Sequence, residues 1–267
     1  MTEQTWAGVR ERVRLLGSAP GAEQVFGYRG HDFALADPLT ADELAELERW
    51  LGVRLPDAYR EFLREVGAGG AGPAYGVFPV RRAAGSGWEW VGDGGNMTTP
   101  TRLTEPFPIE GPGAELLDAL EAEQPDEADF ESAEEYEEAE EAWWDRWETL
   151  MWSEDRTVGA ICLCHIGCAE RRWLVVSGPE RGRIWADARC DGVDMQPLRL
   201  GSDDATPVTF RSWYLEWLEQ AERTAAEVAD TTEVTGTAEV TGTAEVAGTA
   251  EGAPRDGAAR GGAAMAG

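Results

Sequence analysis

The sequence of 267 residues contains no lysine and only two histidines, His31 and His165. Every positively charged side chain is therefore an arginine, whose planar guanidinium pairs well with carboxylates. The glycine-rich run GAGGAGP at 67–73 is not followed by Gly-Lys-Ser/Thr and precedes an expected strand, so we interpret it as a turn rather than a phosphate-binding loop. No apolar run reaches 18 residues and residues 1–16 lack a secretory apolar core, so we expect neither a membrane span nor export.

Positive charge is also scarce, because 23 basic residues stand against 51 acidic ones and leave a net charge of -28. Such a surface repels nucleic acid and anionic membranes, so we expect neither as a partner. It suits a basic protein partner, or it simply keeps the protein in solution. Four cysteines without a signal sequence favour a cytoplasmic protein with free thiols.

Three of the four cysteines and one histidine lie together in ICLCHIGC at 161–168, a composition typical of a metal site. A structural zinc site needs four converging ligands, usually from C-x-x-C turns, and this spacing does not supply them. In a strand, Cys162 and Cys164 share one face while His165 points away. A nucleophilic dyad at Cys168 would need a third, orienting group, which the spacing does not indicate. We interpret the segment as a core strand and expect no metal, no cofactor and no catalytic residue.

Apolar spacing predicts alternating helices and strands along most of the chain. Thr40 and Glu43 form a capping box, and Gly52 ends the helix that follows. A second helix begins at Pro56. Helices are expected at 6–16, 40–51, 56–66, 132–151 and 210–221, and strands at 75–80, 88–91, 161–166, 172–176 and 183–186.

An acidic insertion and a low-complexity tail stand apart from this pattern. Residues 121–148 hold 14 acidic residues and one arginine, within an insertion at about 114–152 that carries an aromatic stripe. The insertion is either a solvated helix whose tryptophans pack on the sheet, or a surface that offers carboxylates to a basic partner. Residues 225–267 are small and polar, with TGTAEV repeated at 235–246, so we expect a disordered tail after a single domain at 1–224.

Several stretches together resemble the SUKH superfamily, which includes the fungal Smi and Knr cell-wall regulators. The helix LPDAYREFL at 55–63 fits the family pattern LP-x-x-Y-R-x-F-L, and the glycine turn at 67–76 follows it as expected. HIGCAERRWLVVSGPERGRIWAD at 165–187 resembles the family's later hairpin. Ala68 and Ala169 depart from the pattern, which has Asn and Gly there. The resemblance covers about residues 25–222 without the acidic insertion.

The resemblance implies one α+β domain whose central sheet, mixed but mostly antiparallel, is flanked by helices. Bacterial members are mostly immunity proteins that neutralise a toxin, often a nuclease, and the family shares no catalytic motif. We therefore expect a non-enzymatic immunity protein that binds a basic toxin domain, with a regulatory scaffold of the Smi and Knr type as the alternative. The residues expected to contact the partner are Glu134, Glu135, Glu137, Glu138, Glu141, Trp144, Trp88 and Trp90.

Overall fold

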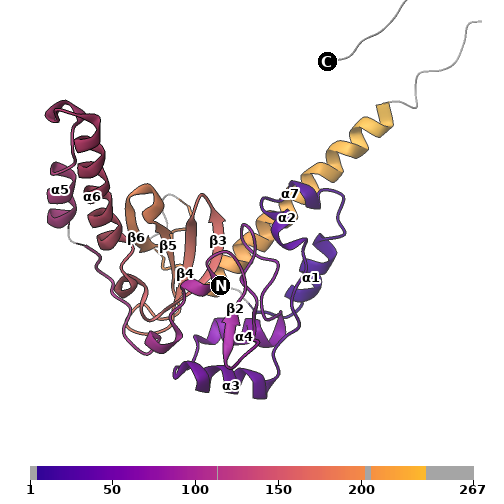
Figure 1. The fold of residues 1–267 in the computed structure, drawn as a ribbon. Coiled ribbons are helices and arrows are strands. Elements are labelled where there is room, and N and C mark those ends of the chain that lie inside the picture. The colour runs from indigo at the N-terminus through magenta and orange to yellow at the C-terminus, as the bar shows by residue number, and fades with distance from the viewer. Residues whose placement is uncertain (1–4, 113, 202–205, 239–267) are drawn as a thin grey trace, which may run out of the picture. The chain divides into compact units, whose positions relative to one another are not determined.

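The computed structural model describes residues 5–112, 114–201 and 206–238, and the chain divides into two compact units, Met1–Asp230 and Thr231–Gly267. The first unit combines helices with two antiparallel sheets, which confirms the expected α+β class (Figure 1). None of the described helices is long and apolar enough to cross a membrane. The α-helices are α1 (Val9–Leu16), α2 (Tyr28–His31), α3 (Ala41–Leu51), α4 (Asp57–Glu65), α5 (Ala114–Ala122), α6 (Ala133–Met151) and α7 (Phe210–Ala238). Short 3-10 helices lie at Ala22–Gln24, Gly95–Met97, Pro100–Arg102, Glu127–Asp129, Glu154–Thr157 and Arg189–Asp191.

The helix pair α3 and α4 follows the signals in the sequence. The Thr40 hydroxyl accepts the backbone N–H of Glu43 at 3.2 Å, and the Glu43 carboxylate accepts that of Thr40 at 2.8 Å, which confirms the capping box. Helix α3 ends at Gly52, whose φ of 69° suits a residue without a side chain. Pro56 caps α4 rather than forming its first residue. The pair buries one apolar face that includes Leu47 and Phe62.

All strand pairings between the named strands are antiparallel. The sheet expected to be mixed has the order β3-β4-β5-β6 and only antiparallel neighbours, because a hairpin joins each strand to the next. A separate ribbon pairs β1 with β2. The Phe78 N–H donates to the Leu163 carbonyl at 2.7 Å and ties the segment before the ribbon to the sheet. The strands are β1 (Val80–Arg82), β2 (Trp88–Trp90), β3 (Ala160–Gly167), β4 (Glu170–Val175), β5 (Ile184–Ala188) and β6 (Val193–Pro197).

Helix α7 closes the core against the N-terminal helices. The rings of Trp6, Phe62 and Tyr214 lie within 6 Å of one another, and the Tyr214 hydroxyl donates to the Ala71 carbonyl at 2.8 Å. The helix continues past Ala225, so residues 225–228 differ from the expected disordered tail. Alanine and glutamate after Thr224 favour a helix, and Ala225 is buried. Residues 239–267 of the expected tail lie outside the described residues.

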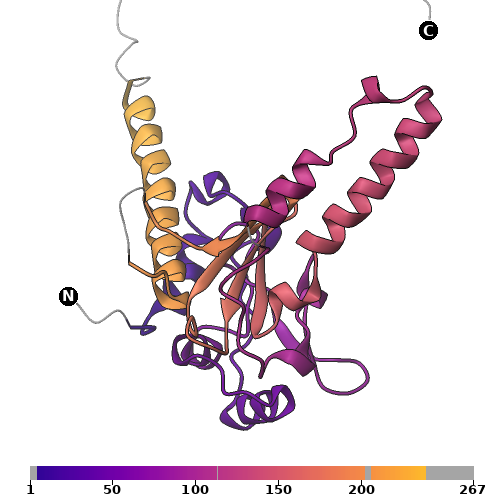
Figure 2. The same ribbon diagram turned by 90° about the vertical axis from the view of Figure 1, so that its left-hand side faces the viewer.

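Helices α5 and α6 form a helical arm, residues 114–151, that runs away from the sheet (Figures 1 and 2). The two helices lie side by side in both views. Ser132 caps α6 by accepting the backbone N–H of Glu135 at 3.3 Å. The arm is therefore an ordered helical pair inserted between the β1–β2 ribbon and β3.

Candidate partner-binding site

The cysteine cluster belongs to the core. Cys162 and Cys164 are buried in β3, and burial raises the pKa of both thiols, that of Cys162 to about 12. The Cys164 thiol donates to the Pro73 carbonyl at 3.2 Å. Cys168 is exposed in the turn that follows β3. In the described ranges no three His, Cys, Asp or Glu side chains are grouped so that they could hold a metal ion. Cys162 and Cys164 thus have the chemistry of small core side chains, whereas Cys168 lies at the surface.

The two histidines lie against one hollow of about 560 Å³, far apart in sequence but close in space. The Tyr75 ring stacks on His165 with centroids 5.3 Å apart, and His165 Nδ1 lies 3.5 Å from the Asp93 carboxylate. Burial lowers the pKa of His31 to about 4, so this imidazole is neutral at pH 7. No cysteine lines the hollow. A cysteine–histidine pair for nucleophilic catalysis is therefore not formed there.

Arg156 holds both ends of the helical arm to the sheet. This side chain is 5% exposed, and its guanidinium forms two hydrogen bonds with the Asp194 carboxylate, at 2.9 and 3.1 Å. It also donates to the carbonyl of Pro108, which precedes α5, and lies over the Phe107 ring at 5.6 Å. Because Arg156 itself follows α6, one residue fixes the entry and the exit of the arm.

A second buried pair fixes the C-terminal end of α6. Arg189 donates to both oxygens of Asp187 at 2.8 Å, and a third N–H reaches the carbonyl of Met151, the last residue of α6, at 2.7 Å. The Arg189 guanidinium lies 4.6 Å from the Trp152 ring centroid. Positive charge at a helix C-terminus stabilises the helix dipole. Arg189 therefore links the C-terminal end of the acidic helix to Asp187 on β5.

One face of α6 collects acidic side chains along its whole length. Helical spacing of three and four residues places seven residues in one stripe, and all seven side chains are exposed. None of these residues takes part in an ion pair within the part of the chain that the structure describes. The arm's one arginine, Arg146, pairs with Glu123, the residue that follows α5. This stripe, the acidic face, consists of Glu134, Glu137, Glu138, Glu141, Trp144, Asp145 and Glu148.

Trp144 is the aromatic member of the acidic face. Its side chain is 46% exposed and packs edge-on against the buried Trp143 ring, with centroids 4.8 Å apart. Trp143 is fixed in turn, because its indole N–H donates to the Leu120 carbonyl at 2.7 Å. An exposed ring held in place in this way loses little freedom when a partner covers it.

The structure brings five of the eight expected contact residues together on the acidic face. Glu135 is exposed but lies off this face, in the first turn of α6, where its N–H donates to Ser132. The expectation for Trp88 and Trp90 is wrong, because both side chains are 5% exposed in the core. The Trp90 indole N–H bonds the Tyr59 hydroxyl at 3.2 Å. Two residues apart on β2, the rings share the buried face of the strand.

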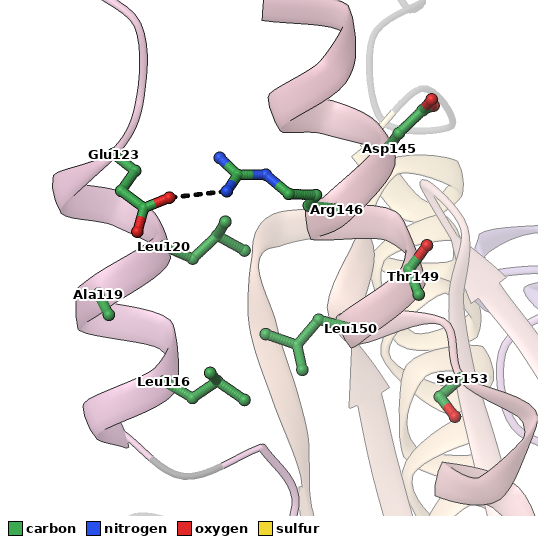
Figure 3. Close-up of a pocket in the computed structure, with 9 residues that line it drawn as sticks. All are labelled: Leu116, Ala119, Leu120, Glu123, Asp145, Arg146, Thr149, Leu150 and Ser153. Carbon is green, nitrogen blue, oxygen red and sulfur yellow. Dashed lines mark hydrogen bonds and ion pairs between the residues drawn. The ribbon is translucent and has the colours of Figure 1, made fainter.

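Helix α5 and the space beside it were missed from the sequence. Leu116, Leu117 and Leu120 follow helical spacing, a signal that predicts a short amphipathic helix. A hollow of about 580 Å³ lies between α5 and α6, with leucines from both helices pointing into it (Figure 3). Its position depends on how the two helices diverge, which spacing along the chain does not reveal.

A comparison with known protein families identifies the family of this chain. A family model described as the SMI1 / KNR4 family (SUKH-1) matches residues 38–186, more than half of the chain. The match extends from the approach to α3 into β5 and includes the helical arm. No curated protein and no solved structure matches the chain significantly. With its α3–α4 pair, its ribbon and its antiparallel sheet, the chain belongs to the SMI1 / KNR4 family (SUKH-1).

Proposed function

We propose that this protein is a non-enzymatic immunity protein that binds a basic toxin domain and blocks it with the acidic face of α6. Membership of SUKH-1 supports a role in immunity or regulation. The observation that carries the proposal is the acidic face, whose six carboxylates are exposed and have no arginine partner in the described ranges. From Glu134 to Glu148 this face is about 21 Å long at 1.5 Å per residue.

The charge of the helical arm supports a basic partner. Residues 114–152 contain 16 acidic residues and one arginine, so this segment carries -15 of the net -28. Carboxylates three and four residues apart repel one another on a helix, and a cationic partner removes that repulsion. A concentrated negative field also speeds the encounter with a basic protein. Trp144 supplies the apolar anchor that such an interface needs at its centre.

The test compares two variants with the same loss of charge. One replaces four carboxylates of the acidic face, E134Q/E137Q/E138Q/E141Q. The control, E23Q/E65Q/E110Q/D191N, replaces four exposed carboxylates outside the arm. Binding to the purified product of the adjacent gene is followed by biolayer interferometry at low and high salt. We expect the first variant to lower the association rate constant at least tenfold at low salt, and the control to lower it much less.

Three outcomes decide the proposal. Loss of binding and of toxin inhibition in the arm variant alone supports an immunity protein that acts through the acidic face. Binding that leaves the partner's activity intact supports the regulatory scaffold instead. Equal association of both variants would show that only the total charge matters, and the acidic face would lose its role.

A further inference from the structure

Helix α5 contains three leucines, yet none of its described side chains is buried. Leu116 is 53% exposed, and Leu117 and Leu120 are half-buried. Short helices in water are stabilised mainly by packing of an apolar face, and the leucines of α5 are packed only in part within the described chain. Its apolar face is therefore available to something outside the protein.

The space that this face lines is a groove between the two arm helices. Leu116 and Leu120 on α5 point across it towards Leu150 on α6, and the Glu123–Arg146 ion pair at 2.7 Å spans one end (Figure 3). Beyond that pair a second hollow, of about 560 Å³, continues towards the tip of the arm. Both hollows include Glu123 and Arg146, so one side of the arm is open along much of its length.

We infer that this groove binds an amphipathic helix of the partner protein, and the inference rests on the proposed function for the existence of that partner. Leucine-sized side chains of the helix enter between Leu116, Leu120 and Leu150, and its arginines or lysines pair with carboxylates at the edges. The α6 residues that line the two hollows run from Ala139 to Leu150, about 17 Å at 1.5 Å per residue. A partner helix of three to four turns covers this length.

Charge selects this occupant over the alternatives. Asp126, Asp129 and Asp145 line the hollows, and none of them has an ion-pair partner among the residues described. A second copy of the arm would place a net charge of -15 against an equal charge of the same sign, and the two would repel each other. Residues 239–267 contain no leucine, isoleucine or aromatic residue and more acidic than basic side chains, so they match neither the groove nor its edges. A cationic helix with an apolar face matches both.

The experiment uses the full chain and a defined probe. The probe is a synthetic helix of about 14 residues made of leucine and lysine, with the leucines on one face. The control peptide has the same composition with the leucines spread around the helix. Affinity is measured by calorimetry, and hydrogen exchange locates the bound peptide. We expect the amphipathic peptide to bind at least tenfold more tightly than the control peptide and to slow exchange in 114–122.

Two protein variants make the result specific to the groove. L116S/L150S changes the lining, while L15S alters an equally exposed leucine on α1, 55% exposed. If the double variant does not keep the parent's circular dichroism, L116S alone replaces it. The groove variant should lose the preference for the amphipathic peptide, and L15S should keep it. Equal binding of the two peptides, or a preference that survives in the groove variant, would overturn the inference.

The inference and the proposed function can fail separately. If the adjacent gene product binds L116S/L150S normally but does not bind E134Q/E137Q/E138Q/E141Q, the acidic face acts alone and the groove inference is wrong. If both variants bind it like the parent protein, the proposed function fails as well.

Discussion

The ion pair between Asp187 and Arg189 gives the sharpest test of how the helical arm is held. Their side chains are 1% and 2% exposed, the lowest values of any ion pair among the described residues. Besides Arg189, Asp187 accepts the Trp173 indole N–H at 2.9 Å. Asp187→Asn removes the negative charge while leaving a group of similar shape, so Arg189 stays buried without a counter-ion. Arg189→Met removes the guanidinium, so the Asp187 carboxylate loses its counter-ion and the Met151 carbonyl loses a hydrogen-bond donor.

The expected cost follows from what each change leaves behind. Breaking a buried pair by removing one partner typically lowers the free energy of unfolding by about 3–5 kcal/mol. The free energy of unfolding of a domain is only about 5–15 kcal/mol, so either single change would remove a large fraction of the stability. The double variant D187L/R189M removes both charges and should be less destabilised than D187N alone. It still leaves the Trp173 N–H unpaired, which costs about 1–3 kcal/mol.

Urea unfolding followed by tryptophan fluorescence measures these differences, with an unchanged m-value as the check that the same surface unfolds. The matched control is Asp93→Asn, because Asp93 pairs with Arg171 at 3.2 Å but is 72% exposed. The control should cost less than about 1 kcal/mol. The reasoning would be refuted if D187N lowered the free energy of unfolding by less than about 1 kcal/mol, or if the double variant were less stable than D187N.

The same pair predicts the response of the protein to acid. Burial alone raises the pKa of Asp187, but the hydrogen bonds and charge of Arg189 outweigh it and hold this pKa below its ordinary value. The stabilisation is therefore complete above about pH 4 and is lost as the pH falls through the folded-state pKa. D187N should show a smaller loss of stability below pH 4 than the parent protein.

Three further predictions concern the rest of the domain. Thr40→Ala should lower the free energy of unfolding by about 1 kcal/mol in urea, and Thr40→Ser should restore it, because the hydroxyl caps α3; equal midpoints would contradict this role. An aromatic disulfide reagent should modify Cys168 and Cys190 in the folded protein and reach the buried Cys162 and Cys164 only after unfolding. Four rapid thiols, or one equivalent of zinc retained after dialysis, would return these cysteines to the list of candidate sites. Because burial lowers the pKa of His31 to about 4, stability should fall as the pH drops from about 6.5 towards 4, and His31→Gln should flatten that dependence in urea titrations.

Local signals in the sequence were sufficient for the helix caps, which depend on neighbours along the chain. The box between Thr40 and Glu43 needs only a spacing of three, and the Ser132 cap needs a hydroxyl before a helical run. Strand β6 escaped prediction because Met195 is the one residue of its five that is buried. The continuation of α7 past 225 also depends on tertiary packing, since Gly21 lies against the backbone of Ala225.

Three tryptophans show where reasoning about a binding surface from composition fails. Trp88, Trp90 and Trp144 are all large anchors beside acidic residues in the sequence, yet two are 5% exposed and one is 46% exposed. The spacing along the chain distinguishes them. Two tryptophans that lie two residues apart share one face of a strand, and two large aromatic rings on one face of a short ribbon are stabilised when that face is buried. Trp144 lies at helical spacing from Glu137, Glu141 and Glu148, a stripe too acidic to be buried. Only the tryptophan that shares its face with carboxylates could therefore have been placed on the surface before the structure was known.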